Sequence, residues 1–224
     1  MTRIDIPYQP RELSEKELTH LDVYLLRSPK ARRMVGLVGA PCLAYWLEFE
    51  FDPTIEVCVE RPRKLELHQN RQVEIDFWTK SVTQDEAYWV VLNLGDSLST
   101  EGGYVPRDFN LWDRVMQRVG IAIKFLSEQE LNSRAQRISN WIRILPYVQA
   151  SRRNSSMTNV MGRIKELFGP GIVSLSFEQI ELSLSDICRN DARIGACVLI
   201  HSGWLKVADH ASISPRTRLS VGPR

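Results

Sequence analysis

The sequence predicts an α/β protein in which a mixed sheet is flanked by helices, with a small winged-helix-like domain at the C-terminal end. Residues 55–59, 63–67, 73–78 and 87–95 have the alternating or continuous apolar pattern of strands. Helical patterns alternate with these strands, an order that favours a sheet covered by helices. After residue 130 the sequence pattern changes, and short helical segments replace the strands.

Capping residues and prolines mark the first helices. A helix is expected over about residues 14–26, because Ser14 and Glu17 form a capping-box pair and leucines follow at helical spacing. Pro41 suits the first turn of a second helix, since its missing N–H costs nothing there. The Asp52-Pro53 step ends that helix, because the residue before a proline avoids the helical region.

The strand pattern also predicts which side chains share a face. Alternation along residues 73–78 puts Glu74, Asp76 and Trp78 on one face. Residues 87–95 are almost continuously apolar, as expected of a central strand covered on both sides. Residues 120–126 are a further short strand candidate.

The composition of the 224 residues is that of a soluble globular protein, with 43% hydrophobic and 25% charged residues and a net charge of +2. No CxxC spacing links its cysteines, so buried thiols are favoured over a zinc site. No apolar run approaches the roughly 18 residues that span a bilayer, and the N-terminus has no apolar signal core. These features predict a cytoplasmic protein without a membrane partner. The cysteines are Cys42, Cys58, Cys188 and Cys197.

This change of sequence pattern predicts a domain over residues 1–148, a Ser/Asn-rich linker over 149–159 and a small domain over 160–224. The small domain is expected to hold three short helices, over residues 160–168, from Ser176, and over 192–201. Its tail is expected to form a two-stranded hairpin, which completes a winged-helix arrangement.

Basic residues cluster in two places, where they form either a solvated surface or a contact with DNA phosphates. Residues 134–165 carry seven basic residues and no Asp or Glu. A shorter basic run spans residues 27–33. The candidate DNA-binding residues are Lys30, Arg32, Arg33, Arg134, Arg137, Arg143, Arg152 and Arg153.

Residues 28–67 resemble the N-terminal domain of TnsA-like transposase endonucleases, and a weaker similarity extends over most of residues 28–221. That family has S-x-K-x-x-R-x-V, then L-E-F-D-P, then a strand ending in E-Q-P. The matching residues here are Ser28, Lys30, Arg33, Val35, Leu47-Glu48-Phe49, Phe51-Asp52-Pro53 and Glu60-Arg61-Pro62.

The resemblance implies a restriction-endonuclease-like fold in which a helix Glu, a strand Asp and a Glu-x-Lys on the next strand bind Mg²⁺ and activate water. Asp76 stands at the strand Asp, but Cys42 stands at the helix Glu. Asn93 and Gly95, expected on one strand face, stand at the Glu-x-Lys. A thiol and an amide are poor ligands for Mg²⁺. The resemblance therefore implies a degenerate site without a metal.

The function expected from this resemblance is that of a TnsA-like subunit of a heteromeric DNA transposase. It would bind transposon-end DNA, a TnsB-like DDE transposase or a TnsC-like ATPase regulator, and would not cleave. The alternative is an active Mg²⁺-dependent endonuclease with a relocated site, built from Asp76, Glu74 and Lys80 or Lys124. On helical geometry, Glu48 and Glu50 lie too far from Cys42 to replace the lost Glu. A third possibility is a regulator that acts through the C-terminal domain.

Overall fold

The computed structural model describes residues 6–68, 71–101, 103–208 and 210–222. The N-terminal residues 1–5, part of the segment expected to lack a signal core, lie outside the described residues. The chain divides into two compact units. The first unit comprises Met1–Trp46 and Thr54–Asn132, and the second comprises Leu47–Pro53 and Ser133–Arg224.

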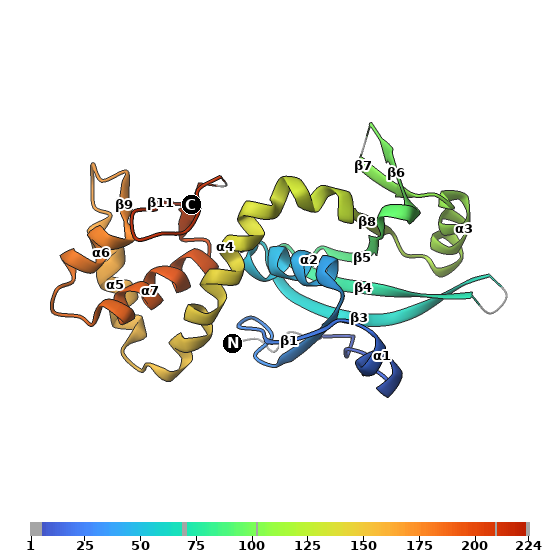
Figure 1. The fold of residues 1–224 in the computed structure, drawn as a ribbon, viewed down its shortest axis with the longest axis horizontal. Coiled ribbons are helices and arrows are strands. Elements are labelled where there is room, and N and C mark those ends of the chain that lie inside the picture. The colour runs from blue at the N-terminus through green and yellow to red at the C-terminus, as the bar shows by residue number, and fades with distance from the viewer. Residues whose placement is uncertain (1–5, 69–70, 102, 209, 223–224) are drawn as a thin grey trace. The chain divides into compact units, whose positions relative to one another are not determined.

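A four-stranded mixed sheet forms the centre of the first unit, as the strand patterns predicted (Figure 1). Its order is β3-β4-β5-β8, with antiparallel pairs between β3, β4 and β5 and a parallel pair between β5 and β8. Strand β5 therefore lies inside the sheet, as its apolar sequence indicated. The strands are β3 (Ile55–His68), β4 (Arg71–Ser81), β5 (Glu86–Leu92) and β8 (Ile123–Ser127).

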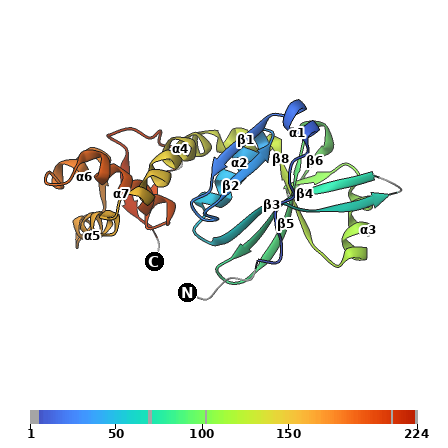
Figure 2. The ribbon, with the colours of Figure 1, turned by 90° about the horizontal axis from the view of Figure 1, so that it is seen from below.

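Two helices lie at different ends of this sheet (Figures 1 and 2). Helix α2 (Ala40–Phe51) begins and ends close to the predicted limits, and the hydroxyl of Tyr45 donates to the carbonyl of Ser127 at the end of β8. Helix α3 (Phe109–Val119) buries its apolar side in a core cluster with β3, β4 and β5. The cluster includes Leu65, Ile75, Val90, Leu92, Trp112 and Val115.

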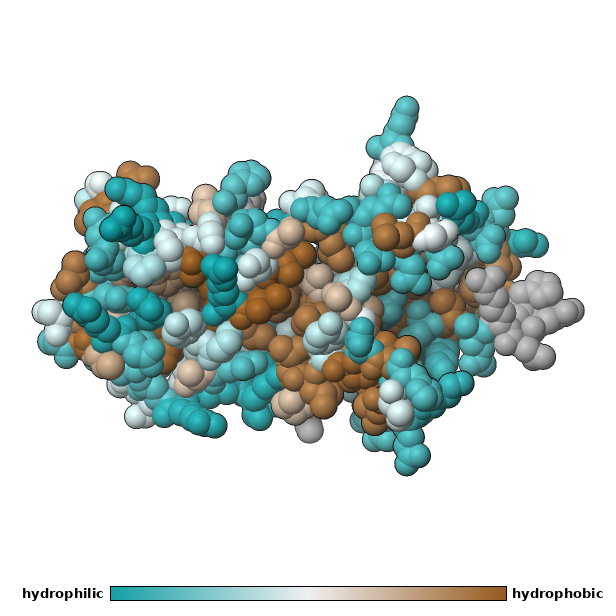
Figure 3. Space-filling model, in the orientation of Figure 1, coloured by the Kyte–Doolittle hydropathy of each residue, from teal (hydrophilic) through white to brown (hydrophobic). Residues whose placement is uncertain are grey.

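The first predicted helix is only partly correct. Ser14 does cap a helix with Glu17, but α1 (Glu15–His20) is short, and strand β1 (Val23–Arg27) takes the place of its second half. Strand β1 pairs with β2 (Met34–Val38) in an antiparallel hairpin. Leu25 therefore lies on a strand with an exposed side chain, and hydrophobic atoms are visible over this hairpin in Figure 3.

A second small hairpin follows β5 in the first unit, and short 3₁₀ helices precede it and follow β8. The hairpin consists of β6 (Ser97–Thr100) and β7 (Gly103–Pro106), and the 3₁₀ helices are η1 (Leu94–Asp96) and η2 (Glu128–Glu130).

The second unit contains helices and a three-stranded antiparallel sheet of order β10-β11-β9 (Figure 2). The predicted helices after residue 157 and the terminal hairpin are present. Ser176 caps α6 through a capping box with Gln179. The elements are α4 (Leu131–Ala150), η3 (Ser151–Arg153), α5 (Met157–Leu167), β9 (Ser174–Ser176), α6 (Phe177–Ser183), α7 (Arg189–His201), β10 (Leu205–Val207) and β11 (Arg218–Val221).

The second compact unit comprises Leu47–Pro53 and the chain from Ser133 onward, whereas the sequence predicted a boundary at residue 148 and a linker over residues 149–159. Helix α4 continues through Pro146 to Ala150, η3 follows directly, and α5 begins at Met157. Ile144, Leu145 and Val148 before this segment and Met157 within it are buried, so packing holds the end of α4 and the start of α5 in place.

In the part of the chain that the structure describes, no helix combines the length and apolar character needed to cross a membrane. The architecture is mixed α/β, as predicted, with one larger mixed sheet and several small ones.

Helices α5 and α7 approach closely at Gly195. A Cβ atom there would lie 2.9 Å from side-chain carbons of Val160 and Ile164, both buried. We expect Gly195→Ala to lower the free energy of unfolding by about 1–3 kcal/mol, because the packed side chains must shift. Gly162 on α5 is the matched control, since a Cβ there meets nothing within 4 Å.

Gly162→Ala should raise the free energy of unfolding by about 0.5–1 kcal/mol through the lower backbone entropy of alanine. Chemical denaturation of both variants and wild type is the measurement. Equal effects of the two substitutions would contradict the close approach of α5 and α7.

Candidate active site around Asp76

Asp76 lies on β4 beside an irregularity in the sheet. The register between β3 and β4 shifts between Glu60 and Arg63, and Arg61 has a positive φ of 46°. Such bulges redirect side chains and are common next to active sites.

Both carboxylate oxygens of Asp76 already have partners. The backbone N–H of Val91 on β5 donates to Oδ2 at 2.7 Å, and the thiol of Cys42 on α2 donates to Oδ1 at 3.6 Å. Burial raises the pKa of Asp76 from 3.8 to about 7, and these two hydrogen bonds oppose the rise only in part. A large fraction of Asp76 is therefore uncharged near neutral pH.

Cys42 lies where the resemblance placed it, beside Asp76, but it is an inert thiol. Burial raises its pKa well above the ordinary value, and the negative charge of Asp76 raises it further. The thiolate is the form that attacks substrates or binds metals. Cys42 is therefore a half-buried thiol that acts as a weak hydrogen-bond donor.

Glu74, the acid proposed to rebuild the site, is bound by an arginine. Arg11 donates from Nε to Oε1 of Glu74 at 2.5 Å and from its terminal nitrogen to Oε2 at 2.6 Å. The same guanidinium binds Glu17, whose pKa falls below its ordinary value because of Arg11 and Ser14. One guanidinium thus holds two carboxylates, and Glu74 has a bidentate partner.

The buried Glu60–Arg61 step, part of the family-like motif, is also paired. Both carboxylate oxygens of Glu60 accept hydrogen bonds from Arg33. This acid is only 2% exposed, and the arginine provides the partner that a buried carboxylate needs. The Arg61 guanidinium donates to the carbonyls of Gly36 and Arg11. Burial lowers the pKa of Arg61, a cost that these contacts offset.

Asn93 and Gly95 do not lie on a strand face, as the resemblance led us to expect. Strand β5 ends at Leu92, and Asn93 precedes η1, which contains Gly95. The Asn93 amide lies 3.5 Å from Asp96, and the Gly95 carbonyl accepts from Arg107 at 2.6 Å. The turn after β5 therefore directs these residues into local contacts instead of toward a strand site.

The other residues considered for a rebuilt site have their own contacts. The Lys124 ammonium lies over the ring of Trp89 at 5.0 Å, and Lys80 pairs in the sheet with Val57 and Glu86. Glu48 and Glu50 belong to the second unit, where they bind Arg137 and His201. The prediction that neither glutamate replaces the helix Glu agrees with these contacts.

A polar cavity of about 180 Å³ contains the candidate residues of the site, among them Cys42, Glu60, Arg61, Glu74 and Asp76. Mg²⁺ demands near-ideal octahedral oxygen coordination, usually from one or two carboxylates, substrate phosphates and several waters. Here Asp76 is partly protonated and twice hydrogen-bonded, while Glu74 and Glu60 are each held by an arginine. Over the described residues, no group of three His, Cys, Asp or Glu side chains is arranged to bind a metal ion. The donor set does not fit Mg²⁺.

Several of the predicted DNA-binding residues have protein partners. The seven basic residues of 134–165 were expected to be uncompensated, but Glu48 pairs with Arg134 and Arg137, and Asp186 pairs with Arg163. Those acids lie outside residues 134–165, so the count of charges within this segment did not reveal the ion pairs. Lys30 donates to the carbonyl of Ile55 at 2.8 Å, and Arg33 binds Glu60.

Arg32, Arg143, Arg152 and Arg153 are exposed. Arg32 has a positive φ of 58°, and Arg152 and Arg153 form the 3₁₀ turn η3. Arg143 donates to the hydroxyl of Ser212 and the carbonyl of Ile213. These four side chains are the candidates best placed to meet an external phosphate.

No known protein-family model matches this chain, and no curated protein matches it.

The raised pKa of Asp76 predicts a specific dependence of stability on pH. The folded protein holds a proton on Asp76 up to about pH 7, whereas the unfolded chain releases it near 3.9. The free energy of unfolding should therefore fall between about pH 4 and 7, by up to about 4 kcal/mol at about 1.4 kcal/mol per pKa unit. Asp76→Asn, which is neutral throughout, should remove this fall.

The measurement is guanidinium denaturation from pH 4 to 8. Asp96→Asn is the matched control, because Asp96 is exposed and should leave the wild-type profile intact. A profile that Asp76→Asn leaves unchanged would show that this carboxyl is charged in the folded protein.

Proposed function

We propose that this chain is a TnsA-like subunit of a heteromeric DNA transposase, which binds transposon-end DNA or its partner subunits and does not cut. One observation carries the proposal: burial favours the neutral form of Asp76, and the other acids of the cavity are each held by an arginine. A site that must bind a divalent cation needs charged, available carboxylates, which this arrangement disfavours.

The position of Cys42 supports the comparison with nucleases of the restriction-endonuclease-like fold. The resemblance aligns Cys42 with a helix Glu and Asp76 with a strand Asp, and these two side chains meet across α2 and β4. A random alignment of two sequences would not bring the corresponding residues into contact. The mixed order of the sheet is also compatible with that fold.

The second unit supports a winged-helix-like domain through its order of elements. A helix, a strand, two helices and a terminal hairpin follow one another from α5 to β11, and β9 joins the hairpin in one sheet. However, most of α7 is buried on several sides. That burial favours a role in assembly over the reading of bases by α7, which needs an accessible helix face.

The absence of cleavage is tested with a supercoiled plasmid that carries the ends of the element encoding this chain. With Mg²⁺ or Mn²⁺, and with or without the partner transposase, wild type should nick no more than Asp76→Ala. The transposition products should then remain joined to donor DNA, because the second strand at each end is not released. Nicking or clean excision that depends on Asp76 would establish the alternative, an active endonuclease that recruits Glu74.

Binding of DNA through the exposed arginines is tested by its salt dependence. Arg153→Gln should reduce the slope of log K against log salt by about 0.9, the value for one phosphate contact on duplex DNA. Arg163→Gln is the matched control, because Asp186 already balances its charge. Equal slopes for wild type and Arg153→Gln would show that Arg153 does not contact a DNA phosphate.

A further inference from the structure

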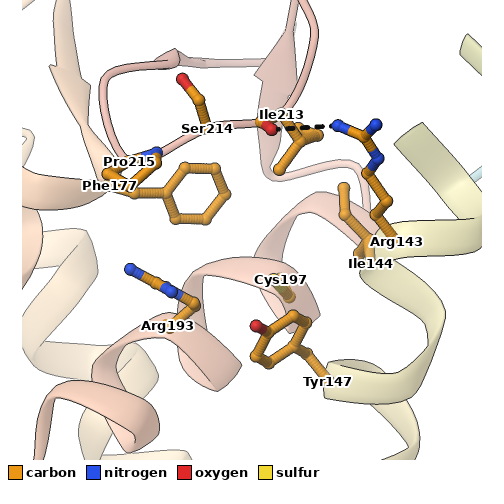
Figure 4. Close-up of a pocket in the computed structure, with 9 residues that line it drawn as sticks. All are labelled: Arg143, Ile144, Tyr147, Phe177, Arg193, Cys197, Ile213, Ser214 and Pro215. Atoms are coloured by element: carbon orange, nitrogen blue, oxygen red, sulfur yellow. Dashed lines mark hydrogen bonds between the residues drawn. The ribbon is translucent and has the colours of Figure 1, made fainter. Parts of the chain in front are cut away.

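A cavity of about 330 Å³ lies within the second unit, separate from the site around Asp76 (Figure 4). Its walls come from α4, from the start of α6, from α7 and from residues 213–215. This volume is at the lower end of the range for small-molecule sites, roughly 300–1,000 Å³. The cavity can therefore hold a small ligand or one large side chain.

The middle of the cavity is apolar and partly aromatic. The ring of Phe177 from α6 and the ring of Tyr147 from α4 border the space from different elements, and Ile144 and Cys197 close its inner side (Figure 4). Ile144 and Cys197 are 1% and 2% exposed, so this wall belongs to the core. Such a surface favours an apolar body over a hydrated ion.

Two arginines at the cavity differ in their charge balance. Arg193 binds the carboxylate of Glu181 with N–O distances of 2.6 and 2.8 Å, so this pair is neutral. Arg143 donates to the Ser212 hydroxyl and the Ile213 carbonyl, and no carboxylate pairs with it among the residues that the structure describes. Among the described residues, the cavity thus carries one positive charge that no carboxylate balances, which matches a single anionic group.

The loop over the cavity is held in place before any ligand binds. The buried amide of Asn140 donates to the carbonyl of Ala211 at 2.7 Å and accepts from the N–H of Ile213 at 3.1 Å. The buried hydroxyl of Thr217 donates to the carbonyl of Ser212, and the N–H of Glu178 donates to the carbonyl of Pro215. A preorganised wall lowers the entropy cost of binding.

We propose that this cavity binds a small apolar carboxylate, with its carboxylate at Arg143 and its body between Phe177 and Tyr147. A charged hydrogen bond to a guanidinium is strong and directional, and the apolar wall rewards a ring or branched chain. The carboxylate can be that of a free organic acid or the chain end of a peptide with an apolar last residue. Neither source requires the DNA or partner binding proposed above.

The probe for the free acid is phenylacetate, with phenylacetamide as its uncharged counterpart. Phenylacetate is titrated into the full chain and followed by NMR, and the signals of residues around Cys197 and Tyr147 should shift. We expect the affinity for phenylacetamide to be at least tenfold lower than that for phenylacetate. A peptide ending in Phe, with a free or an amidated C-terminus, distinguishes the second source. Tighter binding of the peptide acid than of phenylacetate would assign the site to chain ends.

Arg143→Gln should lower the affinity for phenylacetate at least tenfold. Arg143→Lys, which keeps the positive charge, should lower this affinity less. Arg189→Gln on α7 is the matched control, because Arg189 is exposed and does not line the cavity. Equal affinities for phenylacetate and phenylacetamide, shifts confined to other regions, or an unchanged affinity in Arg143→Gln would each overturn the proposal. None of these results bears on the nicking assay, so the two proposals fail separately.

Discussion

The register shift between β3 and β4 is the constraint on which the site around Asp76 depends. At this shift Arg61 adopts a positive φ and turns its guanidinium toward the carbonyls of Gly36 and Arg11. That contact joins β2 and the N-terminal segment to the sheet. Asp76 lies on β4, the strand that pairs with β3 at this shift. Its carboxylate accepts a hydrogen bond from the backbone N–H of Val91 on β5, a donor that would bond to a backbone carbonyl in a regular sheet. Asp76 has therefore become part of the sheet's own hydrogen bonding.

The acids of this region lose their capacity to bind a cation in two different ways. Asp76 is desolvated, so the neutral form is favoured near pH 7. At Glu74, Arg11 holds both oxygens of the carboxylate and shares its guanidinium with Glu17. Desolvation disfavours the charged form of Asp76, and Arg11 occupies an acceptor position on each oxygen of Glu74, so neither carboxylate is freely available to a hard divalent ion.

The second unit uses its charges in a comparable way. Glu48 pairs with Arg134 and Arg137, and Asp186 pairs with Arg163, although these partners are far apart in sequence. Surface pairs of this kind contribute little to stability, but they offset part of the positive charge of the basic segment. Arg143 and Arg153, by contrast, are exposed to solvent.

Local features of the sequence determined many of the elements. Apolar patterns placed β3, β4 and β5, and Ser14 and Ser176 marked two helix starts. These features depend on neighbouring residues and on residue type, which a sequence contains directly.

Only the tertiary structure decided where α1 gives way to β1, where the two units divide, and which acids meet which arginines. The pairing of Arg11 with Glu74 joins residues that are 63 positions apart, and that of Arg137 with Glu48 spans 89. The pKa of Asp76 likewise depends on burial beneath α2 and β5. Strand register, desolvation and long-range ion pairs arise when distant segments pack together, and no local pattern records that packing.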